Sequence, residues 1–315
     1  MAINTVKVTV NGVTVDAVSN GDGTYTATLA APNVTSYNVN SGHYYPVTVV
    51  ATNLAGTSTT VNDQTANIGS SLRLKVKELT APTITFLSLT EAQFLDTARP
   101  SIQFNLADDV DANGIPIGSG VAISELLITV DGVEHRHNDE GVIVSMGANN
   151  SYDVVWTPGN KMNGTLEDGY HTITVEVRDN DGNYSTATRN FYTDTVAPTL
   201  SVTNPQNNSY VPNANLTITG TASDDVSGTP VVNLVLNGIN QGNISVVNNK
   251  FTKEITLVSG ENTIIITATD NAGKSTTITR KVILDTSSPV IASVVIDPNP
   301  VNVGKSYVVT IKVTG

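Results

Sequence analysis

Residues 261–277 decide the fold; they read Glu-Asn-Thr-Ile-Ile-Ile-Thr-Ala-Thr-Asp-Asn-Ala-Gly-Lys-Ser-Thr-Thr. The first half is a β-branched run, which is typical of a strand, and the last residues are polar and alternating. Between the two halves stands Asp-Asn-Ala-Gly, a cluster of residues that form tight turns. The stretch therefore predicts two antiparallel strands joined by a short turn.

The same pattern occurs twice more, in residues 44–60 and 170–186, and the three turn glycines are Gly56, Gly182 and Gly273. Each copy is preceded by a strand that ends in Asn-Gly or Asp-Gly, a strong hairpin signal. An aromatic-led strand lies between that hairpin and the repeated stretch. The earlier strands are residues 8–12, 128–132 and 234–238, and the aromatic-led strands are residues 25–29, 152–156 and 251–255.

A linker signal separates the copies: a carboxylate, three residues and then proline, twice as Asp-Thr-x-x-Pro. It pairs Glu78 with Pro82, Asp194 with Pro198, and Asp285 with Pro289. Proline suits the start of a first strand, where no ladder donor is needed. About seven short strands in each full unit predict an all-β protein of tandem immunoglobulin-like β-sandwich domains. The predicted domains are residues 1–79 (incomplete), 80–196 (with long loops), 197–286, and a two-strand segment, 287–315.

The composition narrows the class of function. The chain has 315 residues and a net charge of −12, which argues against nucleic acid as a partner. It has no cysteine, so disulfides and thiolate metal sites are excluded. The N-terminus has neither the basic nor the apolar region of a secretory signal, and no apolar run is long enough to span a membrane.

The Asp-Thr-x-x-Pro linkers, the Asn-Gly hairpins and Thr-Asp-Asn-Ala-Gly-Lys-Ser-Thr resemble bacterial Ig-like domains of surface adhesins. The whole chain resembles Ig-like tail-associated proteins of Gram-positive phages and prophages. The marks of this resemblance are the unprocessed start, Tyr-Tyr-Pro-Val at residues 44–47, residues 69–76, and Asp-Pro-Asn-Pro-Val at residues 297–301.

This resemblance implies a non-enzymatic structural or decorating component of a phage tail or tail-like particle, exposed for contact with the host surface. Such a protein is made in the cytoplasm without a signal peptide and ends in the virion, an extracellular particle. Two alternatives stay open, a fragment of a secreted bacterial adhesin and a carbohydrate-binding module. The long loops of the second domain, residues 109–124 and 134–150, are the first candidates to contact a host glycan or protein.

The two ends of the chain do not match the middle. The first domain reaches its Asn-Gly strand at Val8, which leaves no room for the first two strands of the sandwich. Residues 287–315 hold such a pair of strands and nothing to pair with them. One hypothesis is strand donation to another copy; others are docking on a different virion protein, and a first domain completed by its own residues 61–70.

Carboxylates are predicted to gather where the domains join. In this sandwich the incoming linker, the loop after the second strand and the turn of the repeated stretch share one pole. Convergent carboxylates suit calcium, which takes six to eight oxygen ligands; the alternative is that these residues only form turns. The predicted ligands are Glu78, Asp108, Asp109 and Asp179 in the second domain, and Asp194, Asp224, Asp225 and Asp270 in the third.

Other candidates are weaker. The turn of the first domain, residues 53–56, has no carboxylate, so we expect no cation site there. His135 and His137 lie two residues apart and, with Glu134 and Asp139, could hold a transition metal, but exposed loop residues are the simpler interpretation. His171 has no evident acid or nucleophile partner, and no motif predicts a catalytic site. Trp156 occupies a predicted core position.

Overall fold

The computed structural model describes residues 2–315, and the chain divides into two compact units between Thr193 and Asp194. The first unit contains domain 1 (residues 2–79) and domain 2 (residues 80–193). The second contains domain 3 (residues 194–286) and the C-terminal hairpin (residues 287–315). Among the described residues, no helix has the length and apolar composition needed to cross a membrane.

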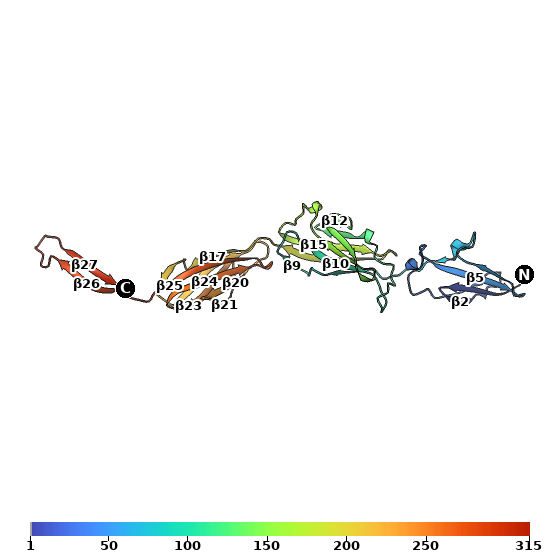
Figure 1. The fold of residues 1–315 in the computed structure, drawn as a ribbon, viewed down its shortest axis with the longest axis horizontal. Helices are drawn as coiled ribbons and strands as arrows, with labels where there is room; N and C mark the ends of the chain where they lie inside the picture. The colour runs from blue at the N-terminus through green and yellow to red at the C-terminus, as the bar shows by residue number, and fades with distance from the viewer. Residues whose placement is uncertain (1) are drawn as a thin grey trace. The chain divides into compact units, whose positions relative to one another are not determined.

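Domain 3 is a complete two-layer sandwich (Figure 1). One sheet has the order β17-β19-β23-β22 and the other β18-β25-β24-β20-β21, with β18 parallel to β25. The strands are β17 (Thr199–Asn204), β18 (Ser209–Val211), β19 (Asn215–Ser223), β20 (Val231–Leu236), β21 (Ile239–Ile244), β22 (Val246–Val247), β23 (Lys250–Thr256), β24 (Gly260–Thr269) and β25 (Ser275–Leu284).

The core of domain 3 follows from the alternation of its strands. Along β24, Ile264, Ile266 and Ala268 are 0% exposed, while the residues between them point outward and are half-buried. Ile218 of β19 in the facing sheet is also 0% exposed. Side chains of the two inner faces therefore interdigitate, as expected for packed sheets.

Domain 2 repeats this architecture with longer connections. Its sheets have the orders β13-β14-β10-β8 and β12-β11-β15-β16-β9, and β9 is parallel to β16. The elements are β8 (Thr83–Phe86), β9 (Gln93–Leu95), β10 (Ile102–Ala107), η3 (Ile123–Glu125), β11 (Leu127–Val130), β12 (Val133–Arg136), β13 (Val142–Met146), η4 (Ala148–Asn150), β14 (Tyr152–Trp156), η5 (Asn160–Met162), β15 (Gly169–Arg178) and β16 (Tyr184–Thr193).

Residues 134–150 are not one long loop, because they include the end of β12 and all of β13. His135 lies on β12 and is 0% exposed, with its ring 5.6 Å from that of Trp156, which is also 0% exposed. The expectation of an exposed loop histidine is therefore wrong. An imidazole on an inward-facing strand position is buried with its neighbours, and the alternation from Val133 puts His135 on the inner face.

Domain 1 has one five-stranded sheet, in which β2-β1-β5-β6 follow in order and β7 pairs with β5. A separate short pair, β3–β4, stands in place of a second sheet. The elements are β1 (Ile3–Val10), β2 (Val13–Asp16), β3 (Val18–Ser19), β4 (Tyr25–Thr26), η1 (Ser36–Asn38), β5 (Tyr45–Asn53), β6 (Ser58–Val61), η2 (Gly69–Leu72) and β7 (Arg73–Leu74).

The core of domain 1 is open. Its only buried hydrophobic residues in the described part of the chain are Val10, 7% exposed, and Tyr45, 5% exposed. Residues 62–72 connect β6 to β7 through a turn and the short 3-10 helix η2. They add no strand to a second layer. One face of the sheet is therefore incompletely covered.

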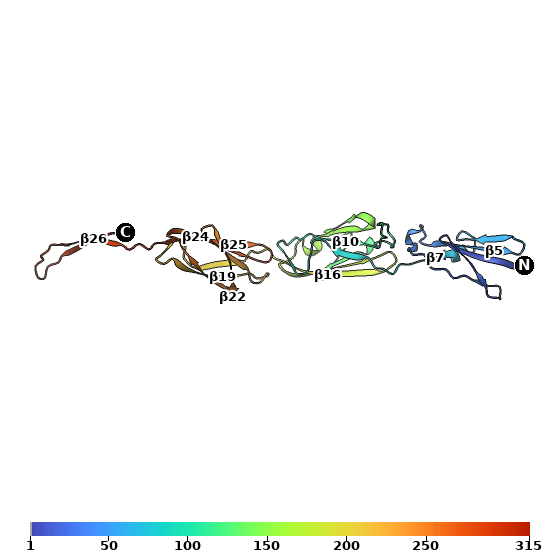
Figure 2. The same ribbon diagram turned by 90° about the horizontal axis from the view of Figure 1, so that it is seen from below.

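The C-terminal hairpin consists of β26 (Val290–Asp297) and β27 (Val308–Thr314), paired antiparallel. Figure 2 shows it as a two-stranded ribbon. Every residue from 286 to 315 is exposed. A lone hairpin of this kind is at best marginally stable in water.

Candidate metal centres

The carboxylates of domain 3 meet at one end of the sandwich. Asp194 precedes β17, Asp224 follows β19, and Asp270 follows β24. Thr199 pairs with Ser223 where β17 begins and β19 ends, so these loops share one pole. One oxygen of each carboxylate lies within 4.8 Å of the others. Asp194 and Asp270 are 1% and 7% exposed.

In each of these three carboxylates, Oδ1 is held by donors of its own loop. Asp224 Oδ1 accepts from the backbone N–H groups of Ser227 at 2.7 Å and Val226 at 2.9 Å. Asp270 Oδ1 accepts from the N–H of Lys274 at 2.8 Å, and Asp194 Oδ1 from that of Val196 at 3.3 Å. Hydrogen bonds of this kind are typical of aspartates that form turns.

The other oxygens are the unusual feature. Oδ2 of Asp194 and Oδ2 of Asp270 are buried and have no hydrogen-bond partner. A buried acceptor without a donor costs about 1–3 kcal/mol, and more when it is charged. Turn formation does not explain this cost, because the turn bonds use Oδ1. Two orphaned anionic oxygens beside a third carboxylate fit a hard, oxygen-seeking cation such as calcium.

Burial and mutual charge repulsion shift the pKa values of this cluster. Burial raises the pKa of Asp194, and the negative charges of Asp224 and Asp270 raise it further, against the opposing N–H of Val196. Burial also acts to raise the pKa of Asp224, but the hydrogen bonds from Ser227 and Val226 outweigh it and lower that pKa. A bound cation would offset the repulsion among these three carboxylates.

Domain 2 carries a second cluster at the corresponding pole, formed by Glu78, Asp108 and Asp179, again with one oxygen of each within 4.8 Å. Burial is the first cause that raises the pKa values of Glu78 and Asp108, and the charge of Asp179 adds to both. A Cβ on Gly118 would lie 2.7 Å from Asp108 Oδ2 and from Glu78 Oε2. The carboxylates therefore pack directly on the Gly118 backbone.

Backbone and amide donors surround this second cluster more fully. Asp179 accepts from Gly182 N–H at 2.6 Å and from the Asn183 side chain at 2.7 Å. Asp108 Oδ2 accepts from Gly120 N–H at 2.6 Å. Among the described residues the cluster has no buried carboxylate oxygen without a hydrogen-bond partner, so the case for a cation is weaker than in domain 3.

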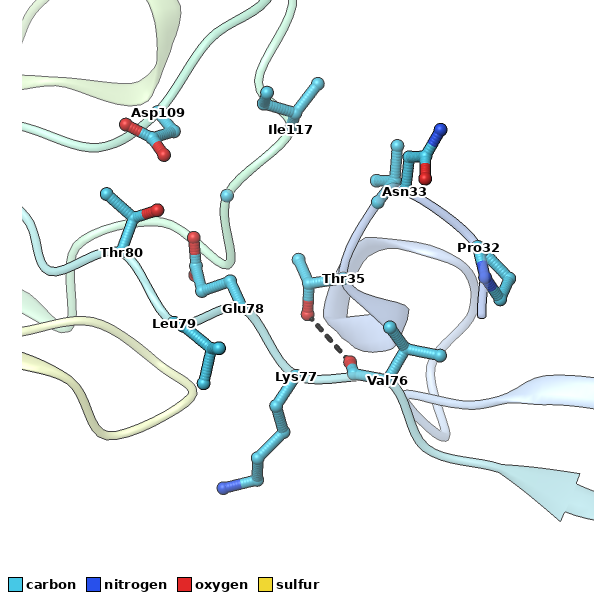
Figure 3. Close-up of a pocket in the computed structure, with 12 residues that line it drawn as sticks. Pro32, Asn33, Thr35, Val76, Lys77, Glu78, Leu79, Thr80, Asp109 and Ile117 are labelled. Carbon is cyan, nitrogen blue, oxygen red and sulfur yellow. Dashed lines mark hydrogen bonds between the residues drawn. The ribbon is translucent and has the colours of Figure 1, made fainter. Parts of the chain in front are cut away.

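The structure leaves two of the eight predicted ligands outside these clusters. Asp225 is exposed and belongs to neither group. Asp109 lines a cavity of about 330 Å³ between the linker and the residue 32–35 loop of domain 1, together with Thr35 and Ile117 (Figure 3). In the turn of domain 1, the side chain of Asn53 accepts the N–H groups of that turn, and no carboxylate is present.

Asp181, which was not among the residues expected from the sequence, connects domain 1 to domain 2. Its Oδ2 accepts from Thr35 Oγ1 at 2.5 Å and from the N–H of Glu78 at 3.1 Å, and its carbonyl accepts from Lys77 Nζ at 2.9 Å. Asp181 occupies the turn position that is alanine in the other two copies of the repeated stretch, at Ala55 and Ala272. That difference was the available signal.

The structure also corrects the interpretation of His171. Its Nδ1 lies 2.7 Å from Asp131 Oδ2 and its Nε2 lies 2.9 Å from Thr193 Oγ1. The chain of groups resembles a nucleophile, base and acid, but Thr193 is 0% exposed and donates to the Glu167 carbonyl. The hydroxyl is therefore inaccessible to a substrate.

The same positions in domain 3 explain this arrangement. Asn237 stands where domain 2 has Asp131, and Asn262 where it has His171. Asn237 Nδ2 donates to Asn262 Oδ1 at 2.9 Å. A side-chain bond from the hairpin turn to the neighbouring strand is thus common to both sandwiches, which makes it structural.

A comparison with protein families gives a match within domain 3. The sequence profile described as glucodextranase, domain B matches residues 198–286. No curated protein matches the chain. Similar solved structures include fibronectin(III)-like modules and titin domains.

Fibronectin(III)-like modules of Clostridium thermocellum CbhA are 17% identical and cover 64% of this chain and 94% of their own, with a TM-score of 0.40. Titin domains A168–A170 are 13% identical and cover 88% and 86%, also with a TM-score of 0.40. Dimeric latent PorU from Porphyromonas gingivalis is 12% identical and covers 91% and 30%, with a TM-score of 0.30. At such identities the likeness concerns the fold alone.

Proposed function

We propose that this chain is a non-enzymatic structural component of a phage tail or tail-like particle, exposed for contact with the host surface. Its sandwiches act as spacers, its joints hold divalent cations, and its C-terminal hairpin joins it to another chain of the particle. The observation that carries the proposal is the hairpin, whose apolar side chains are all exposed although the domains before it are folded.

The arrangement of the remaining residues favours a spacer over an enzyme. The one histidine with both an acid and a hydroxyl partner has an equivalent asparagine in domain 3, as described above. The sequence resemblance to tail-associated Ig-like proteins supports the particle, whereas an adhesin fragment remains the competing assignment.

The location on a particle is tested with an antiserum against the purified chain. It is applied to particles and to cell-wall fractions of the bacterium that carries the gene, after induction of its prophages. We expect labelling of the particles in electron micrographs. Labelling of cell walls in uninduced cells, with unlabelled particles, would establish the adhesin instead.

Calcium is the cation that the oxygen-only donor sets favour. We expect isothermal titration to detect calcium binding to the intact chain, and Asp194→Asn or Asp270→Asn to weaken it at least tenfold. Asp225→Asn is the matched control, because Asp225 lies in the same loop as Asp224 but outside the cluster. Unchanged binding in all three variants would contradict the domain 3 site.

A further inference from the structure

Domain 1 only partly buries side chains whose equivalents in domain 2 are fully buried. The turn glycines align Val8 and Val10 of β1, and Val47, Val49 and Ala51 of β5, with core positions of the other domains. In domain 2 the five equivalents are Ile128, Val130, Ile173, Val175 and Val177, and all are at most 1% exposed. Of the five aligned positions in domain 1, Val10 is buried and the other four are partly buried. The missing cover is the sheet that contains β8 and β10 in domain 2.

The C-terminal hairpin has one apolar face. Cross-strand partners point to the same side of a sheet, and the pairs Ile291–Val313, Val294–Ile311 and Ile296–Val309 fill one side. The other side carries mostly polar pairs, such as Ser293–Lys312 and Val295–Thr310. The six side chains of the apolar face are 44–65% exposed. This hairpin is half of a sandwich core without the other half.

The hairpin matches the first strand pair of domain 2 residue by residue. Twenty residues separate Pro289 from Val309 (309 − 289), and twenty separate Pro82 from Ile102 (102 − 82). The pair Ile291–Val313 corresponds to Ile84–Leu106, and Val294–Ile311 corresponds to Phe86–Phe104, after a one-residue bulge in β26.

We propose that the hairpin of one copy completes domain 1 of a second copy, with β27 added to residues 25–29. Leu106, Phe104 and Ile102 pair with the aromatic-led strand β14 in domain 2. By the same register Val313 faces Tyr25, Ile311 faces Ala27 and Val309 faces Leu29. Residues 25, 27 and 29 of domain 1 are partly buried and alternate with exposed threonines, as a strand of this sheet requires.

Residues 27–30 have this strand pattern but form no ladder in the described structure, where only Tyr25 and Thr26 pair, with β3. Their outer edge is free to accept a strand, and open sheet edges recruit strands. The hairpin supplies both the strand that pairs with this edge and the apolar face that covers the sheet.

A second copy is favoured over closure of one chain on itself because domains 2 and 3 lie between the hairpin and domain 1 in the sequence, and each carries the chain from one pole to the other. Domain 2 receives the chain beside the turn of β15 and β16 and releases it at Thr193, which pairs with Gly169 at the far end of that ten-residue ladder. Domain 3 does the same, ending at Leu284 opposite Gly260. A contact between unlike surfaces of identical chains propagates into filaments or closed rings.

This inference rests on the proposed function only in treating the hairpin as an assembly element. Its test uses two variants of the full chain, Thr28→Cys and Thr310→Cys, which the register places opposite each other on the outer face. The protein has no other cysteine. After mixing the two variants with a short thiol-reactive cross-linker, we expect a covalent product of twice 33.0 kDa.

Two controls test whether the cross-link is specific and whether it forms between chains. Thr310→Cys mixed with Thr57→Cys, whose residue 57 is exposed in the turn after β5, should give no more product than either variant alone. A double variant Thr28→Cys, Thr310→Cys that cross-links only within single chains, with no product from the mixture, would overturn the proposal in favour of self-closure.

Light scattering supplies an independent readout. The intact chain should show a mass that rises with concentration, whereas a chain lacking residues 287–315 should stay at the monomer mass. Ile311→Asp on the apolar face should abolish assembly, and Thr310→Asp on the opposite face of the same strand should preserve it. If the intact chain is monomeric at all concentrations, this inference is rejected, but the proposed role as a spacer in a particle is not. If the chains cross-link but the antiserum does not label particles, only the proposed function is rejected.

Discussion

Domains 1 and 3 contain the same strand, turn and returning strand, yet they bury it differently. Ile266 in β24 is 0% exposed, whereas Val49, at the same position of β5, is only partly buried. Local sequence is enough to form the strands in both domains. Burial depends on a second layer, which domain 3 carries in β17 and β19 and domain 1 lacks in its described residues. Strand formation and core formation are therefore separable in this chain.

The largest expected effect tests this difference at matched positions. Ile266→Ala should destabilise domain 3 by about 3 kcal/mol, because it leaves a cavity in a closed core. Val49→Ala should cost less than about 1 kcal/mol in the monomer, because its surroundings are already open. Hydrogen exchange measured by mass spectrometry resolves the two domains. Equal costs in dilute monomer would mean that domain 1 is closed in solution.

Removal of the cation should have the next largest effect, and domains 3 and 1 should differ in their response to it. At a calcium concentration a hundred times the dissociation constant, binding stabilises the folded state by about 2.7 kcal/mol. Chelation should therefore increase exchange in domain 3 and leave domain 1 unchanged.

Asp270→Asn should abolish the response of domain 3 to calcium. In chelator the same variant should be no less stable than the natural chain, because it removes one of three mutually repelling charges. A large loss of stability in chelator would instead assign Asp270 a purely structural role.

The pH dependence of domain 3 gives a smaller effect, on the order of 1 kcal/mol. Burial raises the pKa of Asp194 above its unfolded value, so the folded state binds this proton more tightly. That contribution is fully present below the unfolded pKa and is lost as the pH rises through the folded pKa. In chelator, domain 3 should become less stable as the pH rises toward neutrality. Calcium should remove this trend, and an unchanged trend would contradict the cation site.

The smallest effect concerns His135 and has the opposite sign. Burial lowers its pKa, as does the charge of Lys161, while Asp139 opposes them. Its neutral form therefore stabilises domain 2 at pH values above the unfolded pKa of about 6.5, and this contribution is lost as the pH falls through the folded pKa. We expect domain 2 to be less stable at pH 5 than at pH 7.5.

Fluorescence of Trp156, the only tryptophan, reports domain 2 selectively. His135→Leu should abolish the loss at low pH, because it removes the titrating group and its two unpartnered ring nitrogens. An identical pH response in this variant would assign the loss to the carboxylates of the domain.

The alternation of apolar and polar residues and the repeated turn motifs predicted the fold well. The turn at Gly273 and the alternation through Ile264 follow directly from residue type, and the structure confirms an all-β tandem architecture. The sequence did not reveal β9 and β18, because three-residue parallel edge strands are too short to show a period. These strands form through tertiary contact with the last strand of each sandwich.

The candidate sites were predictable in part, since loop residues converge only where the topology brings them. The shared pole follows from strand order, which predicts a meeting of Asp194 with Asp270. Nothing in the sequence tells Asp224 from Asp225, because which of two adjacent aspartates points inward depends on the turn that follows. The burial of His135 was missed because a histidine gives no apolar signal.

The Asp181 contacts have a mechanical consequence. This residue joins the turn between β15 and β16 to the linker and to the residue 35 loop of domain 1. A pull on domain 1 would reach domain 2 through several hydrogen bonds loaded in parallel, backed by a ten-residue ladder. Hydrogen bonds loaded in this way resist shear together and break together. The joint should therefore rupture in one cooperative step and should not bend gradually under force.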